Sequence, residues 1–214
     1  VLSVTLTLPE MKNAPVLLAA MALLWSGFAY SQPGSPDPSF GGGDGFSTLS
    51  FLSNGHSSVN AMAVQANGRI LVAGDTWLPN GTENGEMAIA RFMPNGSADP
   101  TFSGDGKTTL SLANMAVGIS DMLILSDGKI LCAGNAWNQS EDYYFLLARF
   151  NANGTPDNSF DGDGIVITRS GVFRQSADAL AVQQDGKIIV AGYINSSGYN
   201  DVAVLRFKPD GTLD

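Results

Sequence analysis

The sequence contains few of the residues on which recognisable chemistry usually depends. Its 214 residues include one histidine, one cysteine and only 14% charged residues. A single cysteine, Cys132, cannot form a disulfide within the chain, so the fold must be stable through packing alone. Cys132 lies in the apolar stretch "KILCAGN", and we interpret it as a small buried core residue.

Catalytic motifs are also absent from the sequence. His56 lies in the polar stretch "SNGHSS" and has no second histidine with which to form a zinc site, and we expect no acid–base role for it. Neither a nucleophile elbow (G-x-S-x-G) nor a phosphate-binding P-loop occurs. We therefore expect a protein that is not an enzyme and that carries no cofactor.

Positively charged residues are also few. The chain has 11 Lys and Arg against 20 Asp and Glu, which gives a formal net charge of -9. An acidic chain without a basic patch repels phosphate groups, so we expect no nucleic-acid partner. Hydrophobic residues make up 44% of the chain and glycines number 25, a combination that favours a folded all-β protein with many turns.

The N-terminal part has the features of a secretory signal peptide. Residues 11–31 combine Lys12 near Met11, the apolar run 16–25, and small residues at Ala29 and Ser31. That run is too short to span a bilayer, and we expect no membrane span in the mature chain. The sequence thus predicts a mis-called leader over 1–10, a helical signal peptide over 11–31, a linker over 32–38, and a secreted or cell-surface protein.

The rest of the chain repeats itself with a period of about sixty residues. "DPSFGGGDG" at Phe40 returns as "DPTFSGDG" at Phe102 and "DNSFDGDG" at Phe160. "NGRILVAG" returns as "DGKILCAG" and "DGKIIVAG", and "ARFMPNGSAD" as "ARFNANGTPD" and "LRFKPDGTLD". These blocks recur in the same order, and they predict three repeats, over 36–98, 99–156 and 157–214.

Each repeat contains four segments typical of β-strands. In the second repeat we expect them at 107–112, 119–125, 129–133 and 143–150, with Asp127-Gly128 as a two-residue type I′ hairpin turn and Gly134 ending the third strand. One such sheet exposes both faces, so it must stack on its neighbours to bury its apolar residues. The sequence therefore predicts a β-propeller-like array of three four-stranded antiparallel blades. Because propellers have about 4–8 blades, three blades cannot close a ring, and we expect an incomplete chain whose third repeat is truncated.

The blocks "DNSFDGDG", "ADALAVQQDGKIIVAG" and "DVAVLRFKPDGTLD" resemble the delta-60 repeat, a propeller-like repeat of large secreted bacterial proteins. The resemblance covers residues 36–214, and the first repeat departs from it only with "NGR" in place of "DGK". It implies export to the cell surface or medium and further blades or a sorting domain of the same polypeptide. It implies no particular chemistry, because members of the family are mostly of undefined function.

An arginine recurs in the fourth expected strand of every repeat. Each is followed eight residues later by an aspartate, and an unpaired buried guanidinium is very costly. We therefore predict one structural ion pair per repeat, joining the last strand to the chain that enters the next blade: Arg91–Asp99, Arg149–Asp157 and Arg206–Asp214. The alternative, a binding role for the arginines, is disfavoured because a residue repeated in every blade usually serves the blade.

Two further features have both a structural and a functional interpretation. Asp161 and Asp163 in "FDGDG" resemble the oxygen ligands of a calcium loop, although turn chemistry explains them equally well and the EF-hand pattern is missing. Trp77 and Trp137 occupy equivalent positions, where Asn195 stands in the third repeat; they either stack on sugars or pack onto the blade edge.

The predicted function is a non-catalytic binding or scaffold role, with another protein or a polysaccharide as the ligand. The first alternative is part of a propeller enzyme that acts on extracellular polysaccharide or protein. The second is a structural repeat array stabilised by calcium. The identical repetition of the polar residues favours the scaffold, because a catalytic site needs different groups that converge at one place.

Overall fold

The structure is a computed structural model that describes residues 34–79, 85–171, 174–196 and 198–214. The chain divides into two units, Val1–Pro36, of which residues 34–36 are described, and Asp37–Asp214. The predicted leader and signal peptide lie outside the described residues, so both stay predictions. Among the residues described, no helix is long and apolar enough to cross a bilayer.

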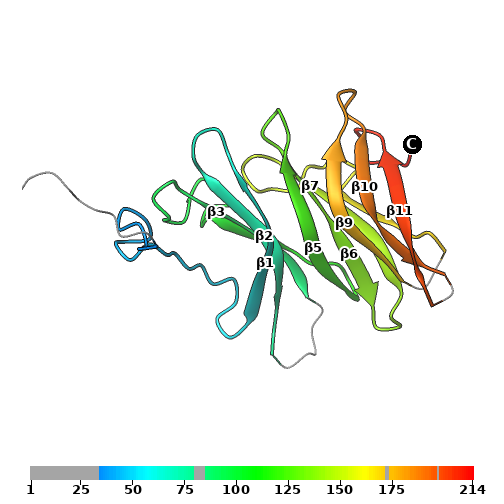
Figure 1. Cartoon of the computed structure of the whole chain (residues 1–214), viewed down its shortest axis with the longest axis horizontal. Coiled ribbons are helices and arrows are strands. Elements are labelled where there is room, and N and C mark those ends of the chain that lie inside the picture. The colour runs from blue at the N-terminus through cyan, green and yellow to red at the C-terminus, as the bar shows by residue number, and fades with distance from the viewer. Residues whose placement is uncertain (1–33, 80–84, 172–173, 197) are drawn as a thin grey trace, which may run out of the picture. The chain divides into compact units, whose positions relative to one another are not determined.

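The second unit is all-β and consists of three antiparallel sheets (Figure 1). The first sheet has the order β1-β2-β3-β4, the second β5-β6-β7-β8 and the third β11-β10-β9. The strands are β1 (His56–Val64), β2 (Ile70–Trp77), β3 (Glu86–Phe92), β4 (Lys107–Leu110), β5 (Met115–Ile124), β6 (Ile130–Asn138), β7 (Tyr143–Phe150), β8 (Ile165–Thr168), β9 (Arg174–Val182), β10 (Ile188–Asn195) and β11 (Asn200–Phe207).

The sheets are offset from the sequence repeats by one strand. We expected residues 107–112 to begin the sheet of the second repeat, but β4 pairs with β3 and completes the first sheet. In the same way β8, from the third repeat, pairs with β7 of the second sheet. Each complete sheet therefore takes its fourth strand from the following repeat, and the third sheet has three strands within the described residues.

The turns between the first two strands of each sheet use glycine, but not in the predicted way. Gly68, Gly128 and Gly186 have φ of 79°, 84° and 82°, whereas the preceding Asn or Asp has no positive φ. A type I′ turn needs positive φ at both central residues, so the prediction of a two-residue turn is wrong. Gln65 N–H instead donates to Arg69 C=O, which closes a three-residue loop that ends in glycine.

The glycine of each "AG" dipeptide does not end its strand, contrary to our expectation. β6 continues through Gly134 to Asn138. Opposite Gly134 the neighbouring strand β5 has a β-bulge between Ile119 and Asp121. A Cβ on Gly134 would collide with the carbonyl oxygen of Gly118, so only glycine fits against the bulge. The same bulge recurs opposite the equivalent glycine in the other two sheets.

The core lies between consecutive sheets. One cluster joins Leu71, Ala73 and Ile89 of the first sheet to residues such as Ile119 and Cys132 of the second. Another joins the opposite face of the second sheet, including Leu147, to the third sheet. Cys132 is completely buried, which confirms its interpretation as a core residue. Each sheet thus buries its faces only by stacking on its neighbours, as the repeat pattern predicts.

Candidate functional site

The structure brings together the two residues of each predicted ion pair. Arg91 Nε donates to Asp99 Oδ2 at 2.7 Å, and Arg149 Nε donates to Asp157 Oδ2 at 2.6 Å. Both aspartates are buried, Asp99 fully. Charge-assisted hydrogen bonds of this length are the strong ones, and they hold the end of the third strand of the sheet against the loop that follows it.

Each of these arginines also contacts the next sheet. Arg149 Nη1 donates to the carbonyl oxygen of Pro209 at 2.6 Å, in the turn after β11, and Nη2 donates to Ser159 Oγ at 3.1 Å. Its guanidinium carbon lies 4.4 Å from the ring centroid of buried Phe160, a cation–π distance. Arg91 makes the equivalent contacts in the first sheet. The guanidinium is therefore a joint between three segments of chain.

The sequence analysis missed a second basic side chain that pairs with each buried aspartate. Lys129 Nζ lies 3.0 Å from Asp157 Oδ2, and Arg69 Nε lies 3.1 Å from Asp99 Oδ2. Both residues directly follow the glycine of an "NGR" or "DGK" block. The recurrence of a basic residue at this position could have indicated the second ion pair. Burial raises the pKa of Asp157, but hydrogen bonds from Ser159, Lys129 and Arg149 outweigh burial and hold it below its ordinary value.

The third ion pair forms at an open end of the array. Arg206 Nε donates to Asp214 Oδ2 at 2.6 Å, and Lys187 Nζ lies 3.1 Å from the same oxygen. The Arg206 side chain is 49% exposed, whereas those of Arg91 and Arg149 are 5% and 10% exposed. Among the described residues its Nη1 and Nη2 have no hydrogen-bond partner, and the side-chain hydrogen bond of Arg206 is the one from Nε.

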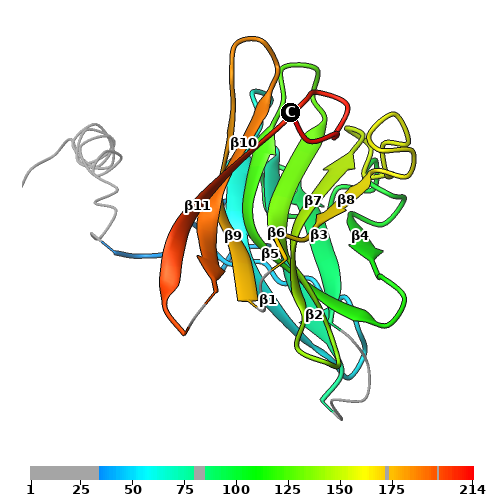
Figure 2. The same cartoon turned by 90° about the vertical axis from the view of Figure 1, so that its right-hand side faces the viewer.

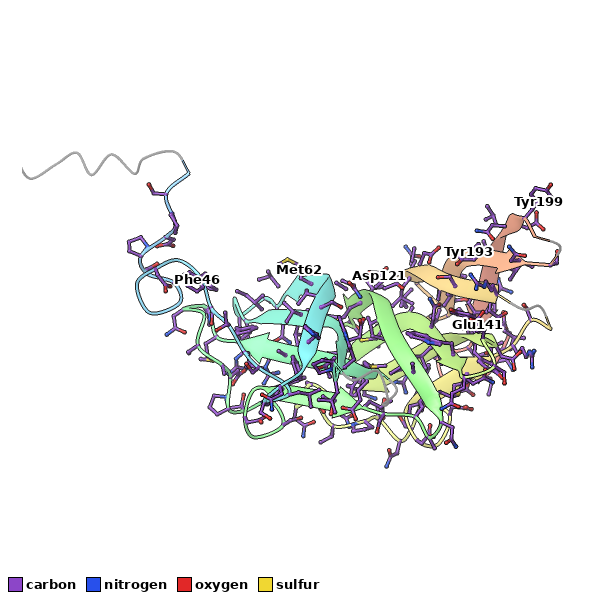
Figure 3. All side chains as sticks on the ribbon, turned by 90° about the horizontal axis from the view of Figure 1, so that it is seen from below. Phe46, Met62, Asp121, Glu141, Tyr193 and Tyr199 are labelled. Atoms are coloured by element: carbon purple, nitrogen blue, oxygen red, sulfur yellow. The ribbon has the colours of Figure 1, made fainter. Side chains whose placement is uncertain are left out.

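Polar side chains at the bulges form further links between sheets. Asn60 Nδ2 donates to the carbonyl oxygen of Ile119 at 2.8 Å, from β1 to β5. Asp121 on β5 accepts the backbone N–H of Leu180 on β9 at 2.8 Å (Figure 3). The sequence analysis missed these residues because their types differ from repeat to repeat. A bulge position gives no periodic signal unless the same side chain recurs there.

The two calcium candidates lie in a turn that joins neighbouring sheets. Asp161 adopts a left-handed conformation, with φ of 49°, and its N–H donates to the carbonyl oxygen of Asp210 at 2.9 Å. Asp163 Oδ1 accepts the N–H of Ile165 at 2.9 Å. Both carboxylates are exposed. In the described residues no group of three His, Cys, Asp or Glu side chains could hold a metal ion.

The two tryptophans pack on aromatic neighbours at the opposite end of the strands. The ring centroids of Trp137 and Tyr143 lie 6.0 Å apart with an interplanar angle of 18°, and the Arg174 guanidinium lies 5.6 Å from the Tyr143 ring. Trp77 lies 5.6 Å from His56 and remains 39% exposed. Each tryptophan has an aromatic partner within its own sheet, so packing is enough to explain its position. Stacking on sugars stays untested.

Two clefts lie on either side of the β5–β6 turn, at residues 125–129. The larger, about 470 Å³, lies towards the third sheet and is lined by Leu123, Asp127, Arg149, Val182 and Pro209. The smaller, about 350 Å³, lies towards the first sheet and is lined by Val64, Gln65 and Asn67. Both share the wall formed by Ile124, Leu125 and Ser126. Volumes of this size suit small ligands or short stretches of polymer.

One atom beside the smaller cleft is left without a partner. Gln65 Oε1 is buried and has no hydrogen-bond partner among the described residues. A buried acceptor without a donor typically costs about 1–3 kcal/mol. The Gln65 side chain lines this cleft, so a ligand hydroxyl or N–H group would remove that cost once the buried amide oxygen turns towards the cleft. The clefts and Gln65 form the candidate functional site. The sequence analysis did not predict it, because no sequence motif marks a cleft that is lined mainly by apolar residues.

These features define the class of protein. Stacked four-stranded antiparallel sheets, joined by one Arg–Asp pair per repeat, are the blades of a β-propeller-type repeat protein. Three segments of the chain, residues 65–102, 125–160 and 183–214, match the family described as "Domain of unknown function (DUF5122) beta-propeller". Each segment runs from the first hairpin turn of a repeat to the region of its Arg–Asp pair. The chain thus carries three repeats of the DUF5122 β-propeller domain.

Other comparisons add little. Among solved structures, a hypothetical protein from Leishmania major has 11% sequence identity to the chain and a TM-score of 0.34. The match covers 76% of this chain and 68% of that one. A similarity this low supports no inference about fold or function. No curated protein matches the chain.

Proposed function

We propose that this protein is a secreted or cell-surface scaffold of the delta-60 repeat type that binds an extended polymer, protein or polysaccharide, without catalysing a reaction. The observation that carries the proposal is the pair of clefts that share one wall. An extended ligand that crosses the turn at residues 125–129 would contact both clefts, and so three successive sheets. Repeat arrays commonly bind extended ligands along such continuous surfaces.

The chemistry of the clefts supports a neutral or weakly cationic ligand. Their walls are mainly apolar, with hydrogen-bonding groups on Gln65, Asn67 and Ser126, a carboxylate on Asp127, and the Arg149 guanidinium, whose charge the Asp157 carboxylate balances. Gln65 Oε1 needs a donor, which both a peptide N–H and a sugar hydroxyl supply. The net charge of -9 works against polyanions.

The recurring polar residues support a scaffold rather than a reactive site. Arg91, Arg149 and their aspartates use their hydrogen-bonding groups in contacts between sheets. A rigid joint in each repeat keeps the clefts at a fixed spacing. A fixed spacing favours binding of a periodic or extended ligand, because little conformational entropy is lost when the ligand binds.

The test blocks both clefts with one substitution. Ser126 is exposed and lines both, so Ser126→Trp fills the shared wall. Gln184, at the equivalent turn position of the third repeat, is exposed and lines neither cleft, so Gln184→Trp is the matched control. Binding is measured by interferometry against a panel of soluble neutral and cationic polysaccharides and a library of extended peptides.

We expect binding to a member of one panel, its loss in Ser126→Trp and its retention in Gln184→Trp. The panel that binds identifies the polymer class. Equal binding by the wild type and Ser126→Trp would show that the clefts are not the site. Turnover of a bound polymer, detected as new chain ends, would show that the protein is an enzyme.

A further inference from the structure

The two clefts of the candidate site are two copies of one structure. The first hairpin turns of the three repeats, coloured cyan, green and orange, lie at the same end of the sheets (Figure 1 and Figure 2). The smaller cleft lies between the first two turns, and the larger lies between the second and the third. Residues 64–67 line the smaller cleft, and their equivalents, residues 124–127, line the larger one. Each junction between the described sheets therefore forms the same cleft.

The two copies differ at a position that sets what each can bind. Gln65 in the smaller cleft has Leu125 as its equivalent in the larger, and each donates its backbone N–H to the carbonyl four residues further on at 2.8 Å. Gln65 Oε1 has no partner among the described residues, whereas Leu125 offers only methyl groups. The other aliphatic residues of the larger cleft are Leu123, Ile124, Val182 and Ile188. The smaller cleft therefore suits a hydrogen-bond donor, and the larger suits an apolar group.

This aliphatic lining favours a peptide over a sugar. A sugar ring carries a hydroxyl on most of its carbons, and a hydroxyl buried against aliphatic side chains loses its hydrogen bonds to water without replacement. Sugars bind well where they stack on aromatic rings, but the described lining of neither cleft includes an aromatic residue. Trp137 and Tyr143 lie at the opposite end of the strands. The side chain of a leucine, isoleucine or valine enters such a cleft without losing hydrogen bonds.

The Asp127 carboxylate adds a preference for a basic residue beside the apolar one. Asp127 lines the larger cleft, and its side chain is 55% exposed. Lys129 Nζ lies 3.8 Å from Asp127 Oδ2 but only 3.0 Å from Asp157 Oδ2, so Lys129 pairs mainly with Asp157. Asp127 is therefore open to a cation of the ligand, and the net charge of -9 attracts such a ligand at longer range.

From these observations we infer that the ligand of the proposed site is an extended peptide that crosses the β5–β6 turn. An aliphatic side chain enters the larger cleft beside Leu125, and a neighbouring lysine or arginine faces Asp127. An N–H group of the peptide donates to Gln65 once that amide turns towards the smaller cleft. An extended peptide offers all three groups, because its side chains alternate and its N–H groups recur along the backbone. The inference rests on the proposed binding function and names the class of its ligand.

The first test pairs a substitution in the protein with a change in the peptide. The probe is the tightest binder from a library of blocked octapeptides that combine one aliphatic residue, one lysine and serines. Leu125→Gln introduces the residue that the equivalent turns carry as Gln65 and Gln183, so the fold tolerates it. It should weaken binding of the probe by about tenfold, but not binding of the probe whose aliphatic residue is alanine. The matched control is Gln183→Leu, which lines neither cleft and should bind as the wild type does.

The second test addresses the hydrogen bond and the charge. Each backbone N–H of the probe is methylated in turn; one position should weaken binding to the wild type by about fivefold and leave binding to Gln65→Leu unchanged. Asp127→Asn introduces the residue that the first repeat has at Asn67. It should weaken the lysine probe by about threefold at low salt and should not affect a probe with norleucine in place of lysine.

The outcomes separate this inference from the function on which it rests. If a β-glucan or a chitosan oligosaccharide binds, no peptide does, and Ser126→Trp abolishes the binding, then the site is correct and the inference of a peptide is wrong. If a peptide binds but Ser126→Trp leaves its affinity unchanged, both the site and the inference are wrong. Equal losses of the aliphatic and the alanine probe in Leu125→Gln, or no peptide bound at millimolar concentration, would also overturn the inference.

Discussion

Replacing Arg149 with leucine tests whether the Arg–Asp joint holds the sheets together. Arg149 donates three hydrogen bonds, to Asp157, Pro209 and Ser159, and its side chain is 10% exposed. Leucine keeps part of the apolar contact with Phe160 but leaves the buried Asp157 carboxylate with Lys129 as its remaining cationic partner. Breaking a buried pair from one side costs about 3–5 kcal/mol.

That cost is large on the scale of a protein of this size. Domains are typically stable by about 5–15 kcal/mol, so Arg149→Leu should remove about a fifth or more of a stability in this range. With a urea m-value of about 2–3 kcal/mol/M, the unfolding midpoint should fall by about 1–2.5 M. The loss should appear first as separation of the third sheet, because the Pro209 contact is what Arg149 adds across that interface.

The matched control is Arg169→Leu. Arg169 pairs with Asp142 at 2.7 Å, but its side chain is 44% exposed and the pair lies at the surface. Exposed pairs contribute about 0–1 kcal/mol, so this midpoint should move by less than about 0.5 M. Urea unfolding followed by circular dichroism measures both variants. Equal losses in the two variants would refute the view that the Arg149 joint holds the sheets together.

Three further predictions concern the backbone, pH and the thiol. Gly134→Ala should cost at least about 1–3 kcal/mol in urea unfolding, because its Cβ meets the Gly118 carbonyl, while Gly118→Ala, with 3.6 Å to its nearest neighbour, should cost much less. Because the folded-state pKa values of Asp99 and Asp157 lie below the unfolded value of about 3.9, their stabilisation is complete above that pH and is lost as pH falls through the folded-state values. The melting temperature should therefore drop below about pH 4, and a flat profile from pH 5 to 2 would contradict this. Burial raises the pKa of Cys132, so a thiol reagent at pH 8 should label it only after unfolding; labelling of the native protein would show that the core opens.

Periodicity in the sequence was enough to predict the fold class and the Arg–Asp pair of each joint. The recurring Arg and Asp, eight residues apart, indicated which residues pair, because a charge on an apolar strand needs a partner nearby. Ile89 and Leu147 occupy equivalent positions in two repeats, and both are buried. The local sequence pattern and the need to bury apolar surface therefore together determine the all-β array of stacked sheets.

Strand pairing and turn geometry were not predictable in the same way. Lys107–Leu110 joins the sheet before it, because the loop at Phe102 holds the chain back beside β3 before it crosses to the next sheet. Gly134 reads as a strand end in the sequence but is required by a bulge on the neighbouring strand. Both depend on contacts between segments that are far apart in the chain.

By itself the sequence determined the period of the chain, the composition of its strands and the residues of each ion pair, because these depend on residues that are close together in the chain. Only the tertiary structure decided which repeat completes each sheet, where the clefts beside residues 125–129 open, and that Arg206 is exposed where Arg149 is buried. Similar local sequence gives different burial at these two arginines, since burial depends on whether another sheet lies against the side chain.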